Sequence, residues 1–234
     1  MTTGLQERPA AEAGEGILSR LAAAVYRYLV LGLFLAGAGA PTVVLWTLLA
    51  RQPENVALFV AALLPIAPAL SAALYAQRAW SVEPDLHPTR ALRRGLVANT
   101  LDVVKWWSVV LVLGVVLVVN IVFAEGVPGG ELLRPVCVVL LVGLVAWSGH
   151  LMVISSFFSF RLRDALRLAA VVLFARWSSS LGFLSLALVT AAVIALTSEA
   201  VLLLLGWAFA GMLWLIARPV QAYVTERFTT RDDA

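Results

Sequence analysis

Few polar side chains lie inside the long apolar stretches of this sequence, where a buried polar group is costly and therefore a candidate for function. His150 and Asn120 are the two whose chemistry is richest. A histidine at that depth could relay a proton. Its stretch contains no aspartate or glutamate, so a packed, hydrogen-bonded histidine is the alternative interpretation. Asn120 is expected to form a hydrogen bond between helices.

The sequence lacks the motifs of common catalytic and metal sites. It contains one cysteine, Cys137, and two histidines, which are too few for a dedicated thiolate or imidazole metal site. No glycine-rich phosphate loop, His-Glu-x-x-His pair or Gly-x-Ser-x-Gly elbow is present. We therefore expect no enzyme activity, no cofactor and no metal. Nucleic acid is not an expected partner, because the basic residues are scattered between apolar stretches.

The composition predicts a membrane protein. Of the 234 residues, 62% are hydrophobic and 13% are charged, whereas charged residues make up about 25% of ordinary soluble domains. Apolar runs of about 20 residues, each long enough to cross a bilayer, recur along the chain. The expected fold is all-α, a membrane bundle of six transmembrane helices over residues 28–50, 55–77, 103–124, 135–155, 177–197 and 200–220.

The basic residues indicate how the chain is threaded. Lysines and arginines divide 15 to 2 between the two alternating sets of flanking segments, and cytoplasmic flanks retain such residues. This predicts a multi-pass protein of the bacterial cytoplasmic membrane with both termini in the cytoplasm. Residues 1–16 are expected to form a disordered tail without the pattern of a signal peptide. Residues 17–224 form a single membrane domain, and residues 225–234 form a second cytoplasmic tail.

Two polar segments between predicted spans repeat a basic, amphipathic pattern. Each is predicted to form an in-plane helix on the cytoplasmic surface, so the fold has six spans and two such helices. One basic face could bind an acidic partner or anionic lipid, or it could only anchor the chain. The arginines concerned are Arg90, Arg93 and Arg94 in the first segment and Arg161, Arg163 and Arg167 in the second.

Small and helix-breaking residues crowd the first two spans. Pro41 lies in the first, and Pro65, Pro68 and Ser71 lie in the second. Two prolines three residues apart remove two backbone donors. This favours a kinked, tightly packed helix pair or, alternatively, a broken helix beside a solute-binding cavity. With His150, these residues are the candidates for a transport pathway.

The stretch Leu64-Pro65-Ile66-Ala67-Pro68-Ala69-Leu70-Ser71-Ala72-Ala73-Leu74-Tyr75 is followed by a basic segment, a third span and, later, the Phe160 to Arg167 segment. In these features the chain resembles the YesL-type family, bacterial membrane proteins of unknown function. The resemblance covers most of residues 64–188. It implies an accessory role beside a carbohydrate transport system, and it implies no catalytic residues.

Two functions are therefore open. The first is an accessory or scaffold subunit whose partners are membrane lipids and a sugar-transporter permease. The second is a small, self-contained transporter or channel for a neutral solute, lined by the first two spans. In that case we expect a homo-oligomer formed through the small-residue face of the last span, at Gly206, Ala210 and Gly211.

Overall fold

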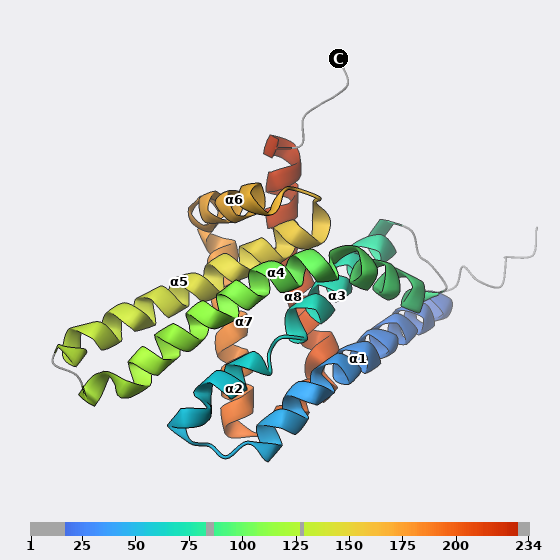
Figure 1. Cartoon of the computed structure of the whole chain (residues 1–234). Coiled ribbons are helices and arrows are strands. Elements are labelled where there is room, and N and C mark those ends of the chain that lie inside the picture. The colour runs from blue at the N-terminus through green and yellow to red at the C-terminus, as the bar shows by residue number, and fades with distance from the viewer. Residues whose placement is uncertain (1–16, 83–86, 127–128, 229–234) are drawn as a thin grey trace, which may run out of the picture.

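The chain is helical throughout the part that the computed structural model describes, which is residues 17–82, 87–126 and 129–228. No strand occurs in these ranges. The long helices pack as a bundle from which one hairpin projects (Figure 1). The elements in order are α1 (Ile17–Leu48), the 3-10 turn η1 (Pro53–Asn55), α2 (Val56–Ala61), α3 (Ile66–Val82), α4 (Pro88–Phe123), the 3-10 turn η2 (Ala124–Gly126), α5 (Gly130–Phe157), α6 (Leu162–Ala175), α7 (Trp177–Leu196) and α8 (Glu199–Phe228).

The predicted all-α architecture with six spans is confirmed by length and composition. Six helical segments of the described chain are long and apolar enough to cross a membrane, and α2 with α3 together form the second of them. The first span is longer than predicted, because α1 begins at Ile17 without a break. The predicted tail boundary after residue 224 lies within α8, which continues to Phe228. The two predicted terminal tails otherwise lie outside the described residues.

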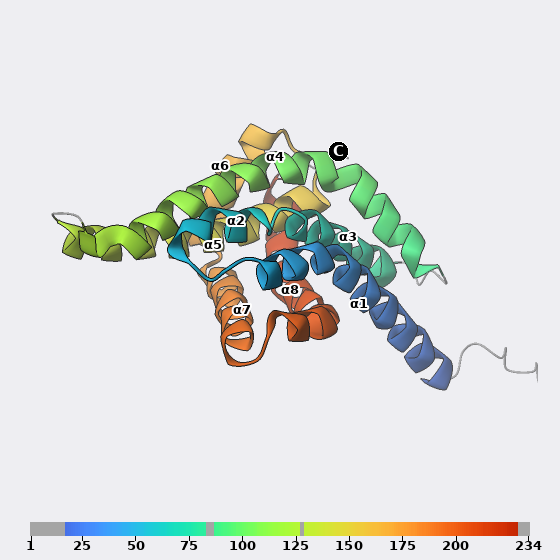
Figure 2. The same ribbon diagram turned by 60° about the horizontal axis from the view of Figure 1, so that its bottom comes forward.

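The two basic segments differ in structure. The first does not form a separate helix: Pro88 begins α4, and the same helix continues for 36 residues into the third span. Proline suits this first position, since its missing N–H would have no helical partner there. Figure 2 shows that α4 bends along its length. The second segment does form a separate helix, α6, which runs across the ends of α7 and α8 in Figure 1.

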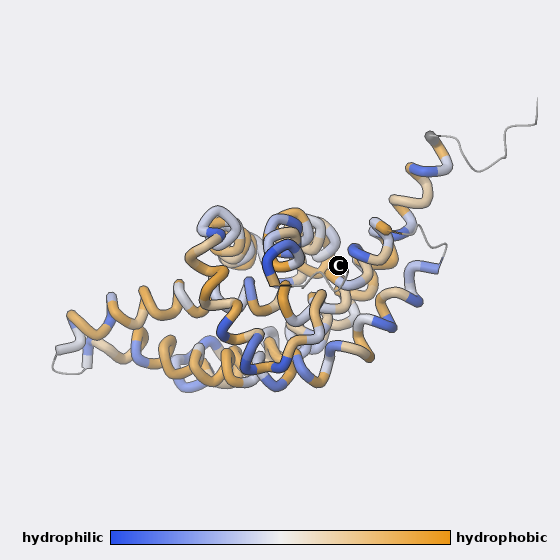
Figure 3. Tube along the Cα trace, turned by 90° about the horizontal axis from the view of Figure 1, so that it is seen from above, coloured by the Kyte–Doolittle hydropathy of each residue, from blue (hydrophilic) through white to orange (hydrophobic). Residues whose placement is uncertain are grey.

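The core lies where α3, α4, α5, α6, α7 and α8 meet, and α1 packs on α8 and α3. The second half of α4 and the first half of α5 instead pair with each other and project from the bundle (Figures 1 and 3). Their outer surface is apolar, with Val116 and Val139 among the exposed residues. Such a surface suits lipid, which accepts apolar side chains without a hydrophobic penalty.

Two ion pairs tie the connections between helices. Arg51, between α1 and α2, contacts Glu199 at the start of α8 with 3.0 Å between Nη2 and Oε1. Arg134 contacts Glu125 across the connection of α4 and α5, with 2.9 Å between Nη1 and Oε1. The α1–α2 and α7–α8 connections therefore lie together. The division of basic residues in the sequence predicts that these two connections lie on the same side of the membrane.

Candidate binding cavity at the broken second span

The second span is broken, which settles the choice between a kink and a break that the sequence left open. α2 ends at Ala61 and α3 begins at Ile66, so the four residues 62–65 are not α-helical. The break ends at Pro65, and Pro68 follows in the first turn of α3. Proline has no N–H to donate and its ring clashes with the preceding turn, which explains why the helix stops here.

The break changes the hydrogen bonds of the backbone. Leu63 N donates to Val60 O, and Ile66 N donates to Leu63 O. These short bonds leave the carbonyls of Phe59 and Ala62 without the donor that a continuous helix would supply four residues later. At membrane depth each such carbonyl needs another partner.

Side chains from two other spans donate to carbonyls at the break, including the two that lack a backbone donor. Thr42 Oγ1 on α1 donates to Ala62 O at 2.6 Å. One turn further along α1, Trp46 Nε1 donates to Phe59 O at 2.9 Å. Trp107 Nε1 on α4 donates to Leu63 O at 3.0 Å. The break is therefore held from both sides by defined side chains.

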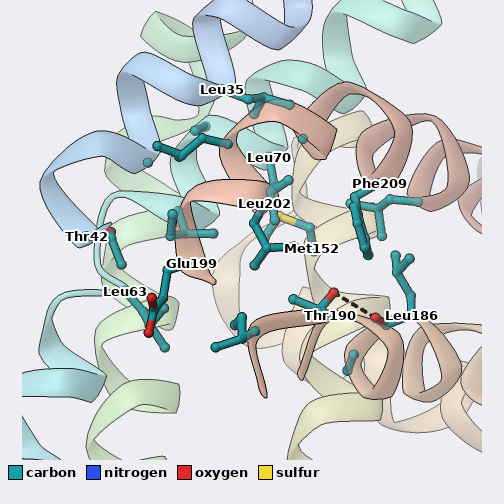
Figure 4. Close-up of a pocket in the computed structure, with 18 of the residues that line it drawn as sticks. Leu35, Thr42, Leu63, Leu70, Met152, Leu186, Thr190, Glu199, Leu202 and Phe209 are labelled. Atoms are coloured by element: carbon teal, nitrogen blue, oxygen red, sulfur yellow. Dashed lines mark hydrogen bonds between the residues drawn. The ribbon is translucent and has the colours of Figure 1, made fainter. Parts of the chain in front are cut away.

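A cavity of about 360 Å³ lies beside the break. Its volume falls within the range of about 300–1,000 Å³ that is typical of small-molecule sites. The walls come from α1, the break, α3, α5, α7 and α8, with Trp107 contributed by α4. Figure 4 shows side chains from these elements surrounding the open space. Leucines, isoleucine, valines, Met152 and two phenylalanines make up most of the lining, so the cavity is strongly apolar.

The spacing of the lining residues indicates an elongated cavity. On α8 they are Glu199, Leu202, Leu203, Gly206, Phe209 and Leu213, which follow one helix face over 14 residues, or about 21 Å. On α7 the face from Phe183 to Ile194 repeats the pattern. Since α1 and α7 both pack on α8, the cavity occupies the space between them, along α8.

Several polar groups in the lining are already engaged by the protein. Thr42, Trp46 and Trp107 donate to the break. Ser148 Oγ donates to Val145 O at 2.8 Å. Thr190 Oγ1 donates to Leu186 O, also at 2.8 Å (Figure 4). Glu199 is the one ionisable side chain among the residues that line this cavity.

None of the five predicted pathway residues lines the cavity, although the structure places it at the two spans that carry four of them. Pro41 is exposed on α1, and Pro68 is buried between lining residues of α3. Ser71 lies outside the lining, where it accepts hydrogen bonds from Ser156 Oγ at 2.8 Å and Asn99 Nδ2 at 3.2 Å. Proline was a signal for the break, but which side chains face the cavity depends on tertiary packing.

His150 is fully buried next to the cavity wall. Its Nε2 lies 2.8 Å from Ser180 Oγ, and its ring packs edge-on against Phe183 with centroids 5.0 Å apart. Ser180 in turn donates to Leu173 O, a backbone carbonyl. No titratable group continues this chain of contacts in the described residues, so the geometry favours a packed histidine over a proton relay.

The six predicted partner-contact arginines lie on the surface. Arg90, Arg93 and Arg94 are exposed at the start of α4. Arg161 precedes α6, and Arg163 and Arg167 are exposed on it. Within the described residues no ion pair engages any of the six, so both groups are free to contact an anionic group.

The small-residue face expected to form a dimer is not available for that purpose. Ala210 is fully buried, and its carbonyl accepts a hydrogen bond from Gln77 Nε2 at 3.1 Å. Gly206 and Gly211 face Leu35 and Tyr28 of α1. The first span of the same chain therefore covers this face, and the prediction of a dimer through it was wrong.

Comparisons with known proteins do not assign the chain to a family. No protein-family model, curated protein or solved structure matches the chain. The resemblance to the YesL-type family therefore stays a prediction.

Proposed function

We propose that this chain is a six-span membrane protein that binds a small apolar molecule at its broken second span, as a transporter or membrane-embedded binding protein. The observation that carries the proposal is the apolar cavity of about 360 Å³ beside residues 62–65. Transporters place solute sites at discontinuous helices, because an irregular backbone is tolerated at membrane depth where it borders a cavity.

The lining also restricts the kind of solute. A sugar would need several free donors and acceptors, whereas the hydroxyl and indole groups here are bonded to the backbone. An apolar solute requires none of these groups. Intramembrane charges that would couple transport to ions are few, which favours transport or binding without ion coupling.

Filling the cavity tests the proposal. Ala187 lines the cavity on α7, so Ala187→Phe should occupy it, while Ala192→Phe is the matched control at an exposed position outside the lining of the same helix. Native mass spectrometry of protein released from native-membrane discs should show a retained apolar molecule on the wild type and on Ala192→Phe. It should be absent from Ala187→Phe. Equal occupancy of all three proteins would overturn the proposal.

Transport is tested separately from binding. Replacing Pro65 and Pro68 by alanine should restore helical propensity across the break and reduce flux of the retained molecule in proteoliposomes. Unchanged flux in this variant would contradict a role for the break in transport. The membrane-embedded binding protein would then be the remaining form of the proposal.

An accessory subunit of a carbohydrate transport system is the second candidate. It is favoured by the exposed arginines of α4 and α6, which no ion pair engages within the described residues. Replacing Arg90, Arg93 and Arg94 by glutamine should release a partner permease that co-purifies with the wild type in mild detergent. If the same proteins co-purify with both chains, this candidate fails.

The proposal includes an orientation in the bacterial cytoplasmic membrane, with both termini in the cytoplasm and α6 lying along the inner surface. The 15 to 2 division of basic residues supports it. The contact of Arg51 with Glu199 supports it too, because both connections are assigned to the outer side. In a Cys137→Ala background, a cysteine at Thr197 should react with an impermeant maleimide from outside, and one at Ser159 should not.

A further inference from the structure

Glu199 gives the cavity a charged end. It is the first residue of α8, where the helix N-terminus favours a negative charge. Its side chain is only 14% exposed. In Figure 4 it lies on the same side of the cavity as Thr42 and Leu63, away from Phe209. A ligand that fills the cavity therefore meets one carboxylate, at one end.

The existing partner of this carboxylate is easily displaced. Arg51 is outside the lining, and its side chain is 82% exposed. An ion pair with so exposed a member contributes little, because water solvates the guanidinium almost as well when the pair is open. A ligand cation could replace Arg51 at Glu199 at small cost.

The remainder of the cavity suits a hydrocarbon chain. Beyond Glu199 the lining of α8 runs through Leu202 and Phe209 to Leu213 with no other ionisable residue. The Trp46 indole, which lines the cavity and is fixed by its bond to Phe59 O, adds an aromatic ring. Aromatic faces attract cations as well as apolar groups.

We propose that the ligand is a single-chain cationic amphiphile such as a long-chain alkylamine. Its ammonium group donates to the Glu199 carboxylate in place of Arg51, and its alkyl chain extends along the apolar face of α8. This inference rests on the proposed function, since it specifies the ligand of the same cavity. It concerns binding only and involves no covalent step.

The test is equilibrium binding of tritiated dodecylamine to the full chain in phosphatidylcholine nanodiscs, with dodecanol and dodecanoic acid as competitors. The amine should bind the wild type about tenfold more tightly than the alcohol, as expected for a charge-assisted hydrogen bond. Glu199→Gln should remove this preference. Glu131→Gln, at an exposed acid on α5 outside the cavity, is the matched control and should keep it.

Arg51→Gln is a second variant that leaves the carboxylate in place. Because the competing cation is gone, dodecylamine should bind about threefold more tightly, and weaker binding would contradict the inference. The inference is also overturned if the wild type binds dodecanol as tightly as dodecylamine, while binding in the cavity itself still stands. If no probe binds, or if Ala187→Phe binds all three probes as the wild type does, the proposed function fails as well.

Discussion

Two neighbouring regions of the bundle handle buried polar groups in different ways. The packed region, formed by Ser71, Tyr75, Gly95, Asn99 and Ser156 of α3, α4 and α5, closes around side-chain hydrogen bonds. Ser156 Oγ donates to Ser71 Oγ, and Asn99 Nδ2 donates to Ser71 Oγ and to Ser156 O. Gly95 allows Tyr75 to pack directly on the backbone of α4.

The cavity region, a few turns away, satisfies a broken backbone with Thr42, Trp46 and Trp107 and leaves open space beside it. The comparison shows that the open space is not a result of weak packing throughout the chain. It lies where the second span stops and where side chains of α1 and α4, rather than backbone N–H groups of the same helix, donate to its carbonyls.

The largest loss of stability is expected from adding a bulky side chain within the packed region. In Gly95→Leu the new Cβ would lie 2.8 Å from the Tyr75 Cβ, which is too close for two carbon atoms. The helices must separate, at a cost of about 1–3 kcal/mol or more. Thermal unfolding in detergent measures this. Gly114→Leu on the same helix is the control, because nothing lies within 4 Å of its added Cβ. If both variants are destabilised equally, the close packing of Tyr75 on Gly95 is not what holds α3 and α4 together.

A smaller loss is expected from removing the central hydroxyl of the packed region. Ser156→Ala deletes the contacts of this hydroxyl with Ser71 Oγ and Met152 O, while Asn99 keeps its bonds to Ser71 Oγ and to the Ser156 backbone carbonyl. Hydrogen bonds between membrane helices contribute up to about 1.7 kcal/mol. Ser155→Ala removes only a bond within α5 and should be close to neutral. If a double-mutant cycle with Ser71→Ala shows no coupling, the hydrogen bond between the two serines does not stabilise the packed region.

At the break, Thr42→Val removes a single bond while nearly preserving shape. The expected loss is about 0.6 kcal/mol, the average for hydrogen bonds between membrane helices. Because Ala62 O loses its donor, amide hydrogen exchange should also rise in residues 62–64 and at Ile66. Thr47→Val is the matched control, since Thr47 bonds only within α1. Exchange that rises equally in both variants would show that Thr42 does not hold the break.

The smallest effect on stability is expected at the mouth of the cavity. Arg51→Gln breaks the ion pair between an exposed guanidinium and the largely buried Glu199 carboxylate, and pairs with an exposed member contribute about 0–1 kcal/mol. Its unfolding temperature should fall by less than that of Thr42→Val, and the difference from wild type should shrink in high salt. A loss as large as that of Gly95→Leu would show that the pair closes the bundle.

Features that depend on local pattern could be predicted from the sequence. The six spans follow from runs of apolar residues. Pro65 and Pro68, through their own missing N–H groups, indicated a kink or a break in the second span, but the sequence did not decide between the two. The sequence did not show that the first basic segment and the third span form one helix, which begins at Pro88.

Features that depend on contacts between distant segments could not be predicted. Trp107 reaches Leu63 across 44 positions of the chain, and Glu199 meets Arg51 across 148. The face at Gly206 and Ala210 resembles a dimer interface in sequence, because a helix of the same chain and a helix of another copy require the same small residues. Only the fold shows that α1 occupies it.

Quenching of cavity tryptophans by bromododecane in nanodiscs tests the central claim most directly, because Trp46 and Trp107 line the cavity. We predict saturable quenching in the wild type and in Ala192→Phe. It should be lost in Ala187→Phe and in a chain with phenylalanine at positions 46 and 107. Quenching that rises linearly with probe and is the same in all four proteins would contradict a binding cavity at the broken second span.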